Sequence, residues 1–234
     1  MVDPDQVIAF YKGGAKTYDK RRFRQGGILV HEVEMRTLEE LLGLSQGNLI
    51  LDLGAGTGRL KTIVKKLDCI AVTCDVSREM LEIAKKRKNP LCVCTDAFNL
   101  PFKNETFDKC VALRLLFHFD DENKTKILRE MLRVAKRNGL IVFDVESSNG
   151  LLSFVTKIKK DNLNYLVTPV RLEEIFTHIR GIKYKLYFSF LISRGIYRHI
   201  PKNVARIFLS MDRFLPNEIK RLKCSTIFCV LLKS

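Results

Sequence analysis

One short segment constrains the fold of this chain more than any other. It is an apolar run, Leu49–Leu53, that ends in Gly54-Ala55-Gly56-Thr57-Gly58. Apolar residues then recur at helical spacing from Leu60 to Leu67, so the segment predicts a strand, a glycine turn and a helix. A turn of this kind lets backbone amides approach an anionic or polar ligand at the start of the helix.

The strand and helix unit repeats along the chain. Further apolar runs predict strands at Cys69–Cys74, Leu91–Cys94, Lys109–Leu113 and Leu140–Val145, and Glu122–Lys136 predicts an amphipathic helix before the last of them. Continuous apolar strands joined by helices indicate a parallel sheet buried on both faces. We therefore expect one doubly wound α/β domain.

Beyond residue 150 the pattern predicts a helix at Leu172–Ile179, a strand at Lys183–Ile192 and a final strand at Thr226–Leu232. The segment Arg198–Lys223 lies between these two strands. Its apolar residues share one helical face, which fits either a helix packed on the core or a lid exposed at the surface.

The spacing of the glycines excludes two common ligand classes. A nicotinamide or flavin dinucleotide turn needs glycine at position 59, where this chain has Arg59. A phosphate-cradling loop that ends in Gly-Lys-Ser/Thr is also absent from the sequence. Nucleotide triphosphate hydrolysis therefore has little support.

Five motifs, in order, resemble those of class I S-adenosylmethionine-dependent methyltransferases and cover about residues 49–145. They are Leu51–Gly58, Cys74–Ser77 with Met80-Leu81, Thr95–Ala97 with Leu100–Phe102, Phe107-Asp108 through Phe119, and Leu132–Gly139. The pattern is most similar to that of enzymes that methylate ubiquinone and menaquinone precursors.

The resemblance implies a seven-stranded, mostly parallel Rossmann-like sheet with helices on both faces and an antiparallel last strand. It implies one domain over residues 1–234. Residues 1–47 would form an N-terminal helical cap, residues 49–145 the cofactor-binding core, and residues 198–223 a candidate lid.

The resemblance also implies which residues bind S-adenosylmethionine and its product S-adenosylhomocysteine. Asp75 would accept both ribose hydroxyls, which are donors. Val76 and Met80 would sandwich the adenine, while Asp96 would accept from its amino group and Ala97 would donate a backbone amide. For each side chain a structural role is the alternative: a helix cap for Asp75, core packing for Met80 and a turn for Asp96.

The methionine end of the cofactor has its own candidates. Gly54, Ala55 and Gly56 would let the chain pass beside it, and Asp52 would orient the loop or receive the ammonium group through water. The Leu113 carbonyl would also accept from the ammonium group.

The segment Ala15-x-x-Tyr18-Asp19 resembles an N-terminal element in which an aromatic ring closes over the cofactor, which makes Tyr18 a candidate. An ordinary buried tyrosine is the alternative. Arg21 or Arg22 could pair with the cofactor carboxylate, but a solvated run of charge is the favoured interpretation.

His118 is the candidate general base, because the free imidazole pKa of about 6.5 suits proton removal from a phenol or an activated ring carbon. Many relatives carry histidine at this place, some of them as His-His, but this chain has Phe117 before His118. A packed histidine near the mouth of the site is the alternative.

The seven cysteines lack Cys-x-x-Cys spacing, so we expect reduced thiols in a cytoplasmic protein and no metal site.

Charge bears on the acceptor. Residues 151–234 hold 16 Lys and Arg against 5 Asp and Glu, a net +11 of the total +15, which favours an anionic partner. The favoured acceptor is a small apolar or anionic molecule such as a quinone precursor, polyprenyl compound or lipid. Ile207, Phe208 and Met211 could then face that acceptor or an anionic membrane. An RNA methyltransferase and a cofactor-binding regulator without turnover remain the alternatives.

Overall fold

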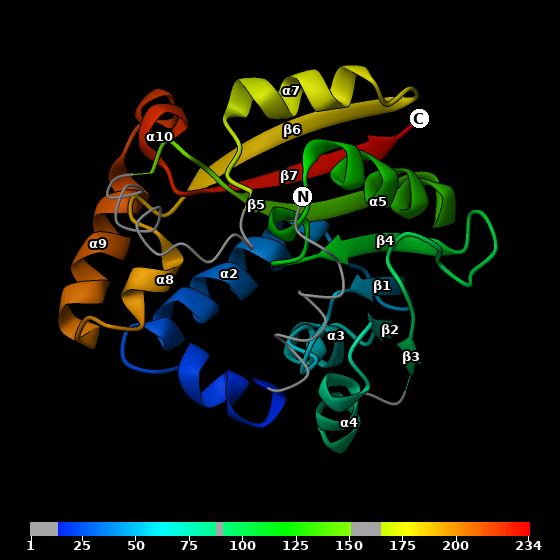
Figure 1. Ribbon diagram of the computed structural model, residues 1–234, viewed down its shortest axis with the longest axis horizontal. Helices are drawn as coiled ribbons and strands as arrows, with labels where there is room; N and C mark the ends of the chain where they lie inside the picture. The colour runs from blue at the N-terminus through cyan, green and yellow to red at the C-terminus, as the bar shows by residue number, and fades with distance from the viewer. Residues whose placement is uncertain (1–13, 88–90, 151–164) are drawn as a thin grey trace.

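The computed structural model describes residues 14–87, 91–150 and 165–234. Within them, seven strands form one sheet in the order β3-β2-β1-β4-β5-β7-β6 (Figure 1). The strands are β1 Leu49–Leu53, β2 Ile70–Asp75, β3 Cys92–Cys94, β4 Phe107–Ala112, β5 Ala135–Glu146, β6 Ile182–Ser189 and β7 Thr226–Lys233. Neighbours among β1 to β5 are parallel, and β7 runs antiparallel to both β5 and β6. The predicted fold class is confirmed.

Helices cover both faces of the sheet (Figure 1). These helices include α2 Gly27–Leu42, α3 Lys61–Lys66, α4 Arg78–Lys86, α5 Asp121–Val134, α7 Pro169–Thr177, α8 Arg194–Tyr197, α9 Lys202–Phe214 and α10 Asn217–Lys223, with a 3-10 turn, η1, at Leu116–His118. One buried cluster joins α5 and α7 to the sheet. A second joins α2, α3, α8 and α9 to the opposite face.

Side-chain caps fix where several helices begin. Ser77 accepts a hydrogen bond from the Met80 amide at the start of α4, and Asp120 accepts one from the Asn123 amide at the start of α5. Such caps satisfy amides that have no partner inside the helix. The cap at Ser77 fixes the direction in which the chain leaves β2.

Several element boundaries differ from the sequence prediction, and the structure gives the reason for two of them. The helix expected to reach Lys136 ends at Val134, because Ala135 already pairs with Phe107 as the first residue of β5. The strand expected to reach Ile192 ends at Ser189, because Phe190 adopts a φ of 62°. That left-handed conformation breaks the extended backbone.

The parallel register brings four strand ends to one edge of the sheet. Leu53 pairs with Cys74, and Asp75 pairs with Cys94, so β1, β2 and β3 end side by side. β4 ends beside β1 at Ala112. The loops that follow these strands therefore meet at the same edge, where ligands bind in open α/β sheets.

The predicted insert, residues 198–223, contains α9 and α10. Only Ala205 and Asp212 of α9 are buried, whereas Ile207, Met211 and Phe214 are 61%, 51% and 84% exposed. One narrow side of α9 therefore packs on the core, and the rest of the helix is exposed. No helix in the described parts of the chain is long and apolar enough to cross a membrane.

Candidate functional site

A cleft opens at the edge where β1 to β4 end. Every predicted site residue except Asp52 lines it. The lining consists of Tyr18, Leu53, Gly54, Ala55, Gly56, Arg59, Asp75, Val76, Met80, Thr95, Asp96, Ala97, Phe98, Leu113, Arg114, Leu115, His118 and Phe119. These residues are hereafter called the cleft.

Asp75, the last residue of β2, presents its carboxylate to the cleft. Its Oδ2 accepts the Gly56 amide at 2.8 Å and its Oδ1 accepts the Ser77 amide at 2.9 Å. Burial raises the pKa of this carboxyl group, and the backbone hydrogen bonds oppose the rise. Each carboxylate oxygen has a further lone pair, so the carboxylate can still accept from a ligand while it ties the glycine turn to the start of α4.

Asp52 does not line the cleft. It lies one residue before the end of β1 and is 5% exposed. Burial raises the pKa of its carboxyl group to about 7, with Arg59 opposing the rise and Asp75 adding to it. Its role in orienting the glycine turn remains a prediction.

The glycine turn follows β1 with positive φ at Gly54, Gly56 and Gly58. At Gly54 (φ 66°) an added Cβ would lie 3.0 Å from the Leu115 Cδ1 atom, and at Gly56 (φ 56°) it would meet nothing within 4 Å. Residues with a Cβ rarely adopt this conformation. The turn therefore needs glycine because its backbone adopts positive φ. At Gly54 it also needs glycine because a Cβ would crowd Leu115.

The predicted adenine contacts come from α4 and from the loops after β2 and β3. Val76 is 41% exposed, unusual for an apolar side chain, whereas Met80 is 1% exposed. Asp96 accepts the Phe98 amide at 3.0 Å through Oδ1, and Ala97 lies between them. An exposed apolar face beside a carboxylate and backbone amides suits a flat heterocycle with an amino group.

The Leu113 carbonyl already has a partner. Arg59 donates to it through Nη2 at 3.1 Å and also contacts Glu34 through Nη1 at 3.3 Å. A carbonyl oxygen has two lone pairs, so a second donor can still bind. The sequence reasoning treated Arg59 only as a missing glycine and did not anticipate this contact.

The helical residues 14–22 close the cleft from the N-terminal side, and residues 1–13 of the predicted cap lie outside the described residues. Asp19 accepts from the Thr57 hydroxyl at 3.0 Å and pairs with Arg87 at 2.5 Å. Tyr18 lines the cleft, and its hydroxyl accepts from Arg22 Nη1 at 3.3 Å. These contacts join the cap to the glycine turn and to α4.

Arginines lower the pKa of the Tyr18 hydroxyl. Burial alone would raise it, but the positive charges of Arg22, Arg59 and Arg114 outweigh burial and bring the pKa below its usual 10. The hydroxyl therefore lies in a strongly positive environment.

His118 ends η1 and is 5% exposed, with its ring centroid 4.1 Å from that of Phe117. His118 is also one of the residues that line the cleft. It is therefore placed where a bound acceptor could reach it.

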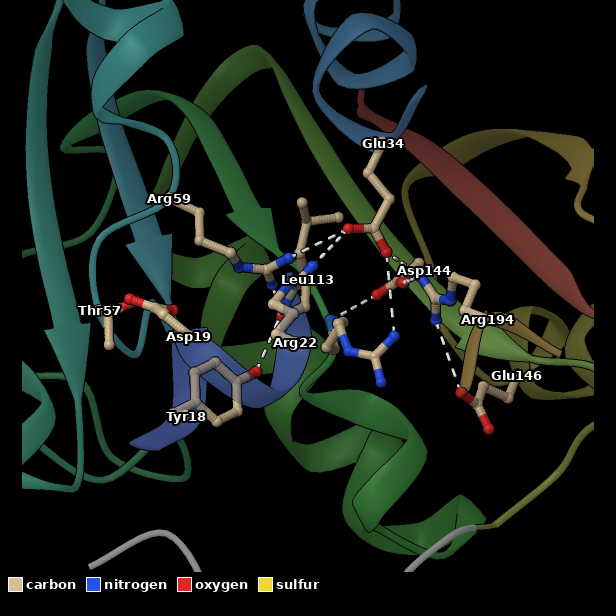
Figure 2. Close-up of polar contacts among 11 residues, drawn as sticks. Tyr18, Asp19, Arg22, Glu34, Thr57, Arg59, Leu113, Asp144, Glu146 and Arg194 are labelled. Atoms are coloured by element: carbon tan, nitrogen blue, oxygen red, sulfur yellow. Dashed lines mark hydrogen bonds and ion pairs between the residues drawn. The ribbon is translucent and has the colours of Figure 1, made fainter. Parts of the chain in front are cut away.

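A charge cluster borders the cleft (Figure 2). Its carboxylates are Glu34 of α2 with Asp144 and Glu146 of β5, and its guanidinium groups are those of Arg22, Arg59, Arg114 and Arg194. Glu34 is fully buried. Burial raises its pKa, but Arg22, Arg194 and Arg59 hold it well below the usual range.

Sequence reasoning missed this cluster and was wrong about Arg22, which was expected in a solvated run of charge. Its side chain is 12% exposed and bonds to Glu34. One signal was available, because Glu34 lies four residues from both Val30 and Leu38 on the buried side of α2. An acid on an apolar stripe requires a cationic partner.

Among the described residues, no group of three or more His, Cys, Asp or Glu side chains is placed to hold a metal ion.

Residues 51–143 match a family model described as a methyltransferase domain. An uncharacterized protein of Methanocaldococcus jannaschii is 33% identical over 156 residues, which are 67% of this chain and 58% of that protein. A demethylmenaquinone methyltransferase of Corynebacterium urealyticum is 31% identical over 165 residues, which are 68% of this chain and 67% of that enzyme. The tRNA (carboxymethyluridine(34)-5-O)-methyltransferase alkbh8 of Xenopus tropicalis is 31% identical over 100 residues, which are 42% of this chain and 15% of that protein.

A solved structure shows the same fold. The magnesium protoporphyrin IX methyltransferase of Synechocystis, with bound S-adenosylhomocysteine, superposes with a TM-score of 0.70 at 13% identity and covers 99% of this chain and 100% of that one. The match to the Corynebacterium enzyme spans 67% of that enzyme, and the family model covers the glycine turn and the loops after β2, β3 and β4. This chain therefore belongs to the class I S-adenosylmethionine-dependent methyltransferases.

Proposed function

We propose that this protein transfers the methyl group of S-adenosylmethionine to a small, largely apolar acceptor such as a quinone precursor, a polyprenyl compound or a lipid. The observation that carries the proposal is the composition of the cleft. Beside the residues assigned to the cofactor and the proposed base His118, it is lined by the apolar residues Leu53, Phe98, Leu115 and Phe119 and by the polar residues Arg59, Thr95 and Arg114. Apolar walls with a few polar groups favour a small ligand over an extended polymer.

The described residues fit the cofactor. Gly56 leaves open space where a Cβ would stand, and the Asp75 carboxylate borders the same space through its bond to the Gly56 amide. Val76 and Met80 would hold the faces of the adenine, and Asp96 and Ala97 would bind its polar edge. The Leu113 carbonyl would bind the ammonium group. When bound, the cofactor supplies an electrophilic methyl group on a sulfonium.

The chain's own residues would mainly hold the acceptor close, aligned and away from water. Tyr18 and its helix close one side of the cleft. His118 is the proposed base for an acceptor that must lose a proton. Methyl transfer needs no base when the attacking atom already carries a free electron pair.

To identify the acceptor, the purified protein and methyl-labelled S-adenosylmethionine would be incubated with separate lipid, quinone, tRNA and peptide fractions. Label in the lipid or quinone fraction supports the proposal. Label confined to tRNA would replace it. Tight cofactor binding with no transfer to any fraction would favour the regulator.

We further propose that the protein contacts anionic membranes through the α9–α10 surface. Ile207, Met211 and Phe214 recur at helical spacing and are all more than half exposed, and Lys202 and Arg206 are exposed on the same helix. Ile219 and Leu222 of α10 are also exposed, at 44% and 65%. An apolar stripe with flanking cations is typical of a helix that lies in a membrane interface.

Cosedimentation with vesicles tests this surface. The native protein should bind anionic vesicles and bind neutral ones far more weakly, and Ile207→Ser with Phe214→Ser should remove most of that binding. Ile70→Ser is the matched control, because Ile70 is an exposed apolar residue of β2. Negligible binding to both vesicle types would refute the membrane contact.

A tRNA acceptor is the second candidate. The net charge of +15 suits a polyanion, and the Xenopus relative is named for tRNA methylation. The match to that relative covers 42% of this chain. Ile207 and Met211 of α9 favour a membrane over RNA, because aliphatic side chains add little to phosphate or base contacts.

A further inference from the structure

Arg114 differs from the other three arginines of the charge cluster. Arg22, Arg59 and Arg194 each donate a hydrogen bond to Glu34. The Arg114 Nη1 atom comes only within 3.9 Å of Glu34, and its side chain donates no hydrogen bond to any residue that the structure describes. Its guanidinium donors are therefore available to a ligand.

The backbone of Arg114 is held in an unusual conformation at the border of the cleft. The residue follows β4 by two positions and adopts a φ of 59°, which is unfavourable for a residue with a Cβ. Its amide donates to Asp144 Oδ1 at 2.5 Å, and its guanidinium carbon lies 5.4 Å from the centre of the Phe117 ring. The side chain is 24% exposed and lines the cleft. Strain of this kind persists where the surrounding contacts enforce it.

The cluster carries one positive charge in excess, because four guanidinium groups face three carboxylates. A partly desolvated positive charge beside apolar walls is stabilised by an anion. The planar guanidinium fork matches a carboxylate, which can accept two parallel hydrogen bonds from it. Within this cluster, Arg114 is the guanidinium that donates no hydrogen bond to a described residue.

We propose that Arg114 binds a carboxylate of the methyl acceptor, so that the acceptor is an apolar molecule with an acid group. The inference rests on the proposed function. Arg114 begins the loop that continues through Leu115 to His118, and both of these residues line the cleft. The loop thus offers a cation, an apolar wall and the proposed base within five residues. The cofactor also carries a carboxylate, so the test must separate the two sources.

Calorimetry can measure the preference for an acid directly. The probes are matched pairs, phenylbutanoate with phenylbutanol and decanoate with decanol, titrated into protein saturated with S-adenosylhomocysteine. The variant is Arg114→Gln. The control is Arg36→Gln, because Arg36 is an exposed arginine of α2.

The native protein should bind the acid of at least one pair about tenfold more tightly than the alcohol. Arg114→Gln should abolish that preference, Arg36→Gln should keep it, and the affinity for S-adenosylhomocysteine should stay within about twofold in both variants. The inference would be overturned if the native protein preferred the acid in neither pair. It would also be overturned if Arg114→Gln kept the preference for the acid.

Two further outcomes separate the inference from the function on which it rests. If Arg114→Gln weakens binding of S-adenosylhomocysteine but not of its analogue without the carboxylate, Arg114 serves the cofactor and the inference is wrong. If the native protein binds no S-adenosylhomocysteine, the proposed function fails first, and the inference fails with it.

Discussion

The Asp75 carboxylate holds the Gly56 amide at 2.8 Å, across 19 positions of sequence. The same carboxylate holds the Ser77 amide with its other oxygen. The residue proposed to bind the ribose therefore also fixes the turn on which the rest of the cofactor would lie. Loop geometry and ligand recognition are joined in one side chain.

Asp75→Asn should destabilise the ligand-free protein by about 1 to 3 kcal/mol. An asparagine can accept from only one of the two amides, and its own NH2 group then faces the other. Urea unfolding at pH 7 measures the change, with Glu40→Gln on an exposed position of α2 as the control. Equal stability of Asp75→Asn and native protein would contradict the two-bond geometry.

Gly54→Ala should cost more stability than Gly43→Ala. Both glycines have positive φ, 66° and 51°, so each alanine bears strain of roughly 1 to 2 kcal/mol. Only at Gly54 does the new Cβ also crowd Leu115. Urea unfolding of both variants gives the difference, and adding Leu115→Ala should narrow it. Identical losses of stability in the two glycine variants would contradict this prediction, because they would show that the Leu115 side chain can move aside without a cost in free energy.

Glu34→Gln should destabilise the protein by about 3 to 5 kcal/mol, because it leaves the buried guanidinium group of Arg194 short of a counter-charge. Thermal or urea unfolding measures the loss. Glu32→Gln changes an exposed acid on the same helix and should have little effect. A loss no greater than that of Glu32→Gln would show that the cluster does not depend on this carboxylate.

The same carboxylate predicts a pH dependence. Its folded pKa lies below the unfolded value of about 4.5, so its contribution to stability is complete above that pH and is lost as the pH falls below it. Between pH 5 and 3 the native protein should therefore lose stability more steeply than Glu34→Gln. Parallel profiles would contradict the low pKa of Glu34.

Asp52 predicts the opposite trend. Its pKa is raised to about 7 from 3.8, so the penalty for ionising it appears as the pH rises between these values. The ligand-free native protein should lose stability over that range relative to Asp52→Asn, by on the order of 2 to 4 kcal/mol. Urea unfolding at pH 5 and pH 8 tests this, and a variant that follows the native profile would contradict it.

Local patterns explain why much of the fold was predictable. The run Leu49–Leu53 and its glycine turn determine β1 and the next helix through neighbours in the chain. Asp75 and Asp96 could be placed because each follows a strand, and parallel strands end at one edge. Boundaries were less accurate, as at Val134, because strand pairing ended that helix.

Contacts between distant segments were not predictable from the same patterns. The bond between Arg194 and Glu34 joins residues 160 positions apart, and local periodicity carries no information on such a pair. Likewise, the apolar spacing of α9 is the same for a buried stripe and an exposed one. Only the packed structure shows that Phe214 faces outward.

Calorimetric titration of S-adenosylhomocysteine into the native protein and Asp75→Ala tests the central claim most directly. The native protein should bind one equivalent, and Asp75→Ala, shown by circular dichroism to be folded, should bind more than about tenfold more weakly, because charge-assisted hydrogen bonds are lost. Glu40→Ala should bind as the native protein does. Equal affinity in folded Asp75→Ala, or no binding by the native protein, would contradict the proposed cofactor site.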